Sequence, residues 1–225
     1  MESTQSPHTV GYILQRFPAL SEPAISEELL HLEAQGVLLH VFSLSRPSDT
    51  GLDQGIAGLR AEITHLPSFT TCSSVREHTL STSSRYPHGY GRALVWALER
   101  GIPSLLRRFV QACQIADIAG LRGVSHFHAQ CAAAPATVAY LSGMILDCPY
   151  SFKAHGQDLR MGRFGTKSLG EKIAHARFVV ASAGEDESCL AQAANGAREK
   201  IVRIDKFDIR QTTASLKALF EESAA

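Results

Sequence analysis

Two histidines placed two positions apart are the first residues of this chain whose types and spacing suggest chemistry. His126 and His128 lie in the stretch HFHAQCAAAP. On a β-strand they would share one face, while Phe127 would point to the other. Imidazoles at this spacing serve as metal ligands, as proton-transfer groups, or as core residues that hydrogen-bond nearby backbone. For His126 we favour the last interpretation, and H-x-H alone is a weak signal for a metal, so we predict no metal site.

Two further polar side chains follow the next apolar run. His155 and Asp158 stand in SFKAHGQDL. If the two runs are neighbouring strands, these side chains converge with the histidine pair at one edge of a sheet. A zinc site combines imidazoles with a carboxylate, so a metal-dependent hydrolase that uses His126, His128, His155 and Asp158 is one hypothesis. The sequence contains no G-x-S-x-G, H-E-x-x-H or P-loop motif that would indicate another hydrolase or nucleotide site.

The elements that must position these residues alternate along the chain. Apolar runs bounded by turn residues predict strands at 9–14, 37–44, 61–67, 123–129, 148–155, 177–182 and 199–204. Helical periodicity predicts helices at 21–36, with Ser21 as N-cap, at 92–99, and again from the stop at 101–103 to about 119. Further helices are predicted at 133–146, 167–176, 185–196 and 211–222. The Ser/Thr-rich stretch 68–91 is predicted to be a mobile loop, with a turn around Gly89.

This alternation indicates an α/β fold, a Rossmann-like parallel sheet with helices on both faces. Open sheets of this kind bind ligands just beyond the carboxyl ends of their strands. His126 and His128 lie at such an end, and His155 follows the next one.

Composition excludes several classes of protein. Lys plus Arg and Asp plus Glu are both 22, so the basic excess of a nucleic-acid binder is absent and we expect no nucleic acid as partner. The five cysteines are scattered without a C-x-x-C pair, which favours free thiols in a reducing compartment. The polar start MESTQSPH lacks the layout of a signal peptide, and we expect a cytoplasmic protein. The uncharged run 131–146 favours a buried helix over a membrane span.

Three segments, in order, resemble the family 4-like glycosyltransferases. YILQRFPALSEPAISEELLHLEAQG is similar to the opening strand, loop and helix of that family, and HFHAQCAAAPATVAYLSGMILDCPYSFKAHGQDL and GEKIAHARFVVASAGEDESCL are similar to later segments. The resemblance spans roughly residues 10–204 and is closest to bacterial enzymes that build exopolysaccharide or colanic-acid-like chains.

The resemblance implies the N-terminal, acceptor-binding half of a GT-B enzyme that transfers a sugar with retention of configuration. It implies catalytic roles for His128, His155 and Asp158, and acceptor binding by Ser21, Glu22, His126 and Gln130. No cofactor is implied, and a nucleotide-sugar would be the co-substrate if a donor domain is paired with this chain. The implied acceptor is a sugar or a lipid-linked saccharide, which adds peripheral contact with the inner membrane, at IPSLLRRF, as an expectation.

The sequence departs from the family pattern at several positions. Pro23 and Ala24 replace a Thr-Phe pair, Gln130 replaces a histidine, and Lys153 replaces a threonine. The family's donor-site signature, two glutamates separated by seven residues, does not occur. We therefore expect a Rossmann-like glycosyltransferase domain at 9–206 and a C-terminal helix at 207–225 that crosses back onto it, with the donor domain missing.

Two hypotheses besides the metal-dependent hydrolase remain open. The chain is an acceptor half in polysaccharide biosynthesis, truncated and incomplete for catalysis alone, which works with a separately encoded donor domain. Alternatively, it is a degenerate, non-catalytic binding module that kept the fold and lost the chemistry.

Overall fold

The computed structural model describes residues 8–19, 22–47, 58–67, 72–154, 166–182, 184–194, 196–204 and 208–224. The strands are β1 (Thr9–Leu14), β2 (Leu38–Ser43), β3 (Glu62–His65), β4 (Val124–Ala129), β5 (Tyr150–Ala154), β6 (Phe178–Ala181) and β7 (Ile201–Arg203). The helices are α1 (Pro23–Ala34), α2 (Cys72–Arg85), α3 (Pro87–Glu99), α4 (Pro103–Leu121), α5 (Ala134–Leu146), α7 (Thr166–His175), α8 (Gly184–Ala193) and α9 (Ile209–Ala224). A short 3₁₀ turn, Arg198–Lys200, precedes β7.

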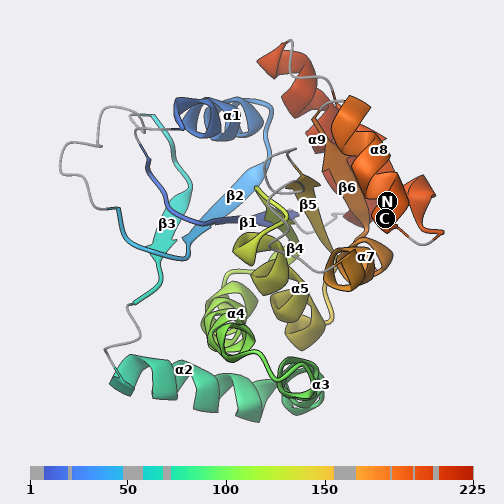
Figure 1. The fold of residues 1–225 in the computed structure, drawn as a ribbon. Coiled ribbons are helices and arrows are strands. Elements are labelled where there is room, and N and C mark those ends of the chain that lie inside the picture. Colours follow the sequence, from blue (N-terminus) through green and yellow to red (C-terminus); the bar gives the residue numbers. More distant parts are fainter. Residues whose placement is uncertain are drawn as a thin grey trace, which may run out of the picture.

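The strands form one parallel seven-stranded sheet in the order β3-β2-β1-β4-β5-β6-β7 (Figure 1). The chain moves outward from β1 to β3, returns to β4, and then moves outward in the other direction. The order therefore reverses between β1 and β4, which creates a topological switch point at the carboxyl ends of these strands. The predicted α/β fold, a parallel sheet with helices on both faces, is confirmed.

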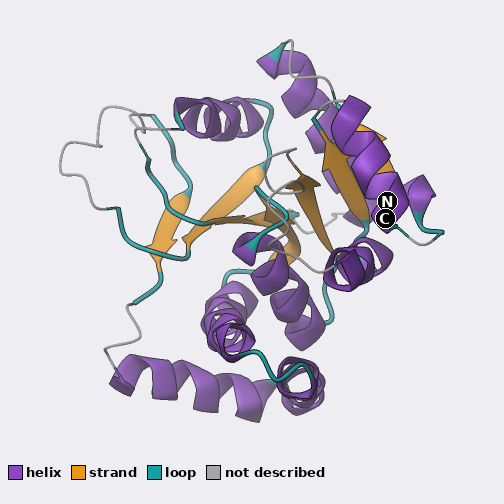
Figure 2. Cartoon of the chain, in the orientation of Figure 1, coloured by secondary structure: helices purple, strands orange, loops and turns teal. Residues whose placement is uncertain are grey.

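Helices cover both faces of the sheet, as Figure 2 shows by colour. The helices α1 and α9 pack together on one face, and α9 also contacts β4. On the other face α5 contacts β1, β4 and β5, and α3, α4 and α7 pack against α5. The helix α2 forms an outer layer on α3 and α4. None of the described helices is long and apolar enough to cross a membrane.

Close packing at the centre of the sheet depends on one glycine. A Cβ atom built on Gly11 of β1 would lie 2.8 Å from a ring carbon of Phe127 on β4. Gly11 therefore lets the Phe127 ring lie flat against β1, beneath α5. This contact fixes the side of the sheet on which Phe127 lies, and the two histidines that flank Phe127 must point to the α9 side.

The prediction of a mobile loop at 68–91 is wrong for the described residues 72–91, which form α2 and the start of α3. Ser and Thr have low helix propensity, but tertiary contacts hold this helix. Asp117 of α4 accepts hydrogen bonds from Ser81 Oγ at 2.6 Å and from His78 Nδ1 at 2.8 Å. Gly89 lies within α3 and not in a turn. A Cβ atom at this position would be 2.2 Å from the carbonyl oxygen of Ile145, so only glycine permits this approach of α3 to α5.

Candidate functional site

A strip of polar side chains crosses the α9 face of the sheet on the three neighbouring strands β1, β4 and β5. Register places Tyr12 of β1 beside His128 of β4, and His128 beside Ser151 of β5. Alternation then puts His126 and Lys153 on the same face. All five side chains are buried. Their backbone neighbours Phe127 and Phe152 point to the α5 side and belong to the apolar core there.

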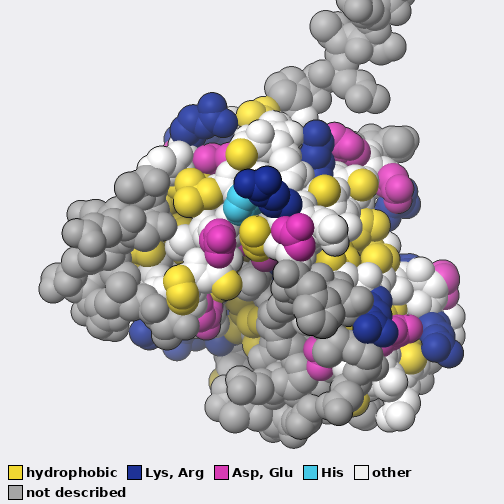
Figure 3. Space-filling view, turned by 90° about the horizontal axis from the view of Figure 1, so that it is seen from above, with side chains coloured by type: hydrophobic (Ala, Val, Ile, Leu, Met, Phe, Trp, Pro, Cys, Tyr) yellow, Lys and Arg dark blue, Asp and Glu magenta, His cyan; other side chains and the backbone are white. Residues whose placement is uncertain are grey.

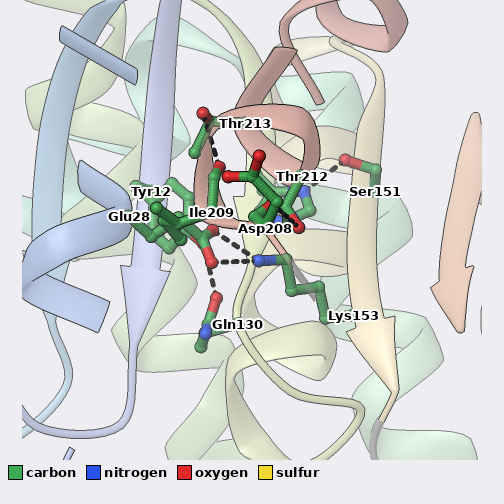
Figure 4. A network of polar contacts seen from close by, with 10 residues as sticks. Tyr12, Glu28, Gln130, Ser151, Lys153, Asp208, Ile209, Thr212 and Thr213 are labelled. Carbon is green, nitrogen blue, oxygen red and sulfur yellow. Dashed lines mark hydrogen bonds and ion pairs between the residues drawn. The ribbon is translucent and has the colours of Figure 1, made fainter. Parts of the chain in front are cut away.

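Four residues of the switch point form one buried network (Figure 4). The Lys153 ammonium donates hydrogen bonds to both carboxylate oxygens of Glu28, which comes from α1. The Tyr12 hydroxyl lies 2.5 Å from Glu28 Oε1 and 2.5 Å from Gln130 Oε1, just after β4. Only 3% of the Lys153 side chain and 7% of the Glu28 side chain are exposed. The network therefore joins β1, α1, β4 and β5 in the crevice where this fold type places ligands.

Charge explains the order within the network. Burial, followed by the nearby Glu28 carboxylate, raises the pKa of Tyr12 well above its usual value, so the phenol stays protonated. A phenol has a single proton, and the carboxylate is the stronger acceptor, so Tyr12 donates to Glu28. The Gln130 amide can then donate to the Tyr12 oxygen. A rotation of the Gln130 side-chain amide by 180° exchanges its oxygen and NH₂ group and places the NH₂ group beside Tyr12.

The two histidines form a second chain of hydrogen bonds beneath α9. Ser223 Oγ of α9 lies 2.9 Å from His126 Nδ1, and Ser151 Oγ lies 2.7 Å from His126 Nε2. The same Ser151 oxygen lies 2.7 Å from His128 Nδ1. Both ring nitrogens of His126 are thus engaged. The Nε2 atom of His128 is buried without a hydrogen-bond partner among the described residues, so His128 keeps an unused hydrogen-bonding position.

Burial keeps both imidazoles neutral. Desolvation, with smaller contributions from His8 and Arg177, lowers the pKa of His126 to about 3. Desolvation, then the Lys153 charge and His126, lowers the pKa of His128 well below its usual value. A neutral imidazole has one donor and one acceptor nitrogen. His128 can therefore hold a hydroxyl group without carrying a charge.

A cavity of about 210 Å³ opens beside the network. Its polar lining residues come from α1, β4, β5, the end of β6 and α9: Glu27, Glu28, Gln130, Lys153, Ser182 and Thr212. Apolar lining includes Val180, Ile204 and Ile209. On the face of the molecule seen in Figure 3, the described Lys and Arg side chains lie in small separate groups beside acidic and apolar ones. The cavity thus offers carboxylate, amide, ammonium and hydroxyl groups within a partly apolar wall.

The predicted site residues differ in their placement. Gln130 lines the cavity, while His126 and His128 have no exposed surface and lie behind the network, against Phe220 of α9. Glu22 is exposed and directly precedes α1. Three predicted residues lie outside the described part of the chain: Ser21, His155 and Asp158. The structure thus brings His126, His128 and Gln130 together, and their predicted roles stay predictions.

Sequence reasoning missed Tyr12 and Glu28 and treated Lys153 only as a departure from a family pattern. Two signals could have found the ion pair. Glu28 lies three positions after Ile25 and four before Leu32, on the apolar stripe of α1, where a carboxylate requires a buried partner. Lys153 lies in the apolar strand YSFKA, where an ammonium requires the same.

A metal centre finds no support in the described residues. No group of three or more His, Cys, Asp and Glu side chains there could hold a metal ion. Ser151 engages His126 and His128 at 2.7 Å each, so these nitrogens are already used. His155 and Asp158, the other two members of the hypothesised zinc site, are not described.

Comparisons with known proteins identify related folds. No family model and no curated protein matches the sequence. A crystal structure of a glycosyltransferase from Rickettsia africae matches with a TM-score of 0.50 and 13% identity over 89% of this chain. The chain spans 43% of the length of that glycosyltransferase. A sucrose-phosphate synthase from Thermosynechococcus elongatus matches with a TM-score of 0.57 and 11% identity.

The second match covers 97% of this chain and 100% of the synthase chain. At these identities the likeness concerns the fold. The chain therefore has a Rossmann-like α/β fold of the GT-B glycosyltransferase type.

Proposed function

We propose that this chain is the acceptor-binding half of a retaining, nucleotide-sugar-dependent GT-B glycosyltransferase of polysaccharide biosynthesis. The observation that carries the proposal is the polar cavity at the switch point of a GT-B-type sheet. Its lining of carboxylate, amide, ammonium and hydroxyl groups matches the donors and acceptors of a sugar. Its size of about 210 Å³ suits a single sugar unit.

The proposed reaction joins an acceptor hydroxyl to the anomeric carbon of the donor sugar. The bond from that carbon to the nucleoside diphosphate breaks, and the diphosphate leaves with the electron pair. The bond to the acceptor oxygen forms on the same face, and the acceptor hydroxyl passes its proton to the departing diphosphate. Such a reaction depends on preorganised dipoles around the reacting centre more than on a strong base.

The described residues divide this work between two layers. Gln130 and Lys153 line the cavity and hold acceptor hydroxyls, while Glu28 fixes the Lys153 ammonium and lines the cavity itself. His128 lies behind them as the predicted catalytic residue, and its unused Nε2 atom is a hydrogen-bonding position for the reacting hydroxyl. For the acceptor to reach His128 Nε2, the side chains of the Glu28–Lys153 network must move when the substrate binds.

Two departures from the family pattern support an adapted site over a decayed one. Gln130 and Lys153, which replace a histidine and a threonine, both join the network around Glu28 and Tyr12. A new buried ammonium with no counter-ion would destabilise the fold strongly. Because Glu28 supplies that counter-ion, the changes fit one another. This favours a functional acceptor pocket over the degenerate binding module.

A separate half is proposed to hold the nucleotide-sugar. The chain spans 43% of the Rickettsia glycosyltransferase and matches the synthase chain along its whole length. Both facts are compatible with a half enzyme whose last helix returns to the sheet. We propose that the donor half is separately encoded and that both halves work in the cytoplasm.

Peripheral contact with the inner membrane is proposed at the turn between α3 and α4. Ile102 and Leu106 are 51% and 39% exposed there, and Arg107 is exposed beside them. Apolar side chains flanked by arginines suit the interface of an anionic bilayer. Sedimentation with vesicles containing anionic lipid tests this contact, and the double variant Ile102→Ser, Leu106→Ser should stay in the supernatant.

The test of the function is a binding experiment. The protein is titrated with methyl glycosides of glucose, galactose, fucose and N-acetylglucosamine, and with UDP-glucose and GDP-mannose, by ligand-observed NMR. We expect at least one glycoside to bind and both nucleotide-sugars to fail. Gln130→Leu should weaken glycoside binding about tenfold, and Glu77→Gln on α2, far from the cavity, should not.

The outcomes separate the hypotheses. Nucleotide-sugar binding by the chain alone, or no glycoside binding at all, would contradict an acceptor half. Stoichiometric zinc or manganese in the purified protein would instead favour the hydrolase. Glycoside binding without turnover under any pairing with a donor half would leave the non-catalytic module.

A further inference from the structure

A second and larger hollow lies at the other end of the strands, where their amino ends meet the helices. This groove of about 720 Å³ is lined by residues of α3 and α5, the start of β5 and the end of α7. Figure 1 shows where these four elements lie in the fold. The groove therefore opens at the amino ends of the strands, while the switch-point cavity opens at their carboxyl ends. The two hollows share no lining residue. The proposed glycosyltransferase function makes no use of this groove.

Aromatic rings form the inner wall of the groove. Tyr140 is the central ring, and its centroid lies 5.3 Å from Trp96, 5.5 Å from Tyr150 and 5.3 Å from His175. The Trp96 indole is fixed because its N–H donates to Glu171 at 2.6 Å. A rigid row of rings is the wall that a flat apolar ligand requires, since stacked and edge-to-face contacts depend on orientation.

The wall also carries one unused polar group. The Tyr140 hydroxyl forms no hydrogen bond within the described part of the chain, whereas the Tyr150 hydroxyl donates to the Lys172 carbonyl oxygen at 2.5 Å. Burial, and then the charge of Glu171, raises the pKa of Tyr140 to about 12, so the group remains a neutral hydroxyl. A neutral hydroxyl can donate to a ligand and accept from it.

Gly91 leaves the groove open. A Cβ atom built on Gly91 would meet nothing within 4 Å, in contrast to Gly89, whose Cβ would collide with α5. Glycine inside a helix costs about 1 kcal/mol relative to alanine, so the packing of α3 does not explain Gly91. A side chain at this position would extend into the groove.

We propose that the groove between α3 and α5 is a second ligand site, for a planar aromatic small molecule with one hydrogen-bonding group. Because the Trp96 and Tyr140 rings are inclined by 81°, the flat ligand stacks on one of them and meets the other edge-to-face. The Tyr140 hydroxyl binds its polar group. A volume of about 720 Å³ lies within the range of small-molecule sites, and a mostly apolar wall with few polar groups is their usual composition.

The experiment uses the only tryptophan of the chain as the reporter. The sequence contains one Trp, so a ¹H–¹⁵N spectrum has a single indole signal, that of Trp96 in the groove wall. The probe is 2-naphthol, and its saturated counterpart decahydro-2-naphthol has the same carbon skeleton and hydroxyl group without the planar rings. We expect 2-naphthol to shift the indole signal saturably and to bind about three- to tenfold more tightly than the saturated alcohol.

Variants locate the site. Gly91→Leu should weaken 2-naphthol binding at least tenfold while raising the melting temperature, because it fills the groove and improves helix propensity. Ala34→Leu, an exposed position on α1 at the other face, is the matched control and should bind normally. Tyr140→Phe should weaken binding about three- to tenfold, since it removes one hydrogen bond.

Four results would overturn the proposal. These are no saturable shift up to the solubility of the probe, unchanged binding by Gly91→Leu, equal binding of the saturated alcohol, or unchanged binding by Tyr140→Phe. The groove lies outside the switch-point cavity, so failure of this experiment leaves the acceptor proposal untouched.

Discussion

Removing one charge of the Glu28–Lys153 pair should cost far more stability than removing both. The two side chains are 7% and 3% exposed, so both charges are largely removed from bulk water. Removing one member of a buried ion pair typically costs about 3–5 kcal/mol, because the other charge stays buried without that partner. We expect this cost for Glu28→Gln and for Lys153→Met, which keep the shapes of the side chains they replace.

The double variant Glu28→Gln, Lys153→Met should be milder than either single change, at about 1–3 kcal/mol, because no isolated charge remains. Urea denaturation measures this cycle. With a slope of about 3 kcal/mol per M, the single variants should lower the urea midpoint by about 1–1.7 M. The exposed neighbour Glu27→Gln is the control and should change the free energy of unfolding by less than about 0.5 kcal/mol.

The coupling energy decides the outcome. If the cost of the double variant equals the sum of the single costs within about 0.5 kcal/mol, the two charges do not interact, and the network is not the buried ion pair described above.

Three further predictions concern other parts of the fold. Since the pKa of His126 is about 3 in the folded state, the unfolded chain binds a proton below about pH 6.5 that the folded chain excludes. The free energy of unfolding should therefore decrease as the pH is lowered, by about 2 kcal/mol between pH 8 and pH 5. In urea titrations, His126→Gln should remove this contribution to the pH dependence. Iodoacetamide at pH 8 should label the exposed Cys189 well before Cys113, whose pKa burial raises to about 12, and mass spectrometry of the peptides would reveal the reverse order. Phe220→Ala should cost about 3–5 kcal/mol and make residues 209–224 sensitive to protease, whereas an unchanged digestion pattern would mean that Phe220 does not hold α9 in place.

Local sequence signals were sufficient for most of the sheet. The run TVGYIL has apolar residues on both faces and turn formers on both sides, and β1 occupies Thr9–Leu14 as predicted. The stretch 72–85 was wrongly predicted as a loop, because the helix there is held by tertiary contacts and not by the helix propensity of its residues. The side chains of Ser81 and His78 bond to Asp117, a residue more than thirty positions away, and no local pattern announces such a partner.

The site was predictable only in part, for a related reason. The order of strands and helices placed His126, His128 and Gln130 at a carboxyl edge. The participation of Tyr12 depends on the register of β1 against β4, which is set by contacts such as that of Gly11 with Phe127. The pairing of Glu28 with Lys153 joins residues 125 positions apart. A buried charge can be recognised on an apolar stripe, but its partner is chosen by tertiary packing.

The position of α9 has a consequence for synthesis of the protein on the ribosome. The helix α9 (Ile209–Ala224) contacts β4 and follows all seven strands in the sequence, so the middle of the sheet is completed only after every strand has been made. Until then, the nascent chain exposes the polar strip of β4 and β5 together with Phe178. Vectorial folding can therefore assemble the α5 side early, while the α9 side closes only after residues 209–224 have left the exit tunnel. For this reason a chain stalled shortly before residue 209 should be a preferred substrate for chaperones.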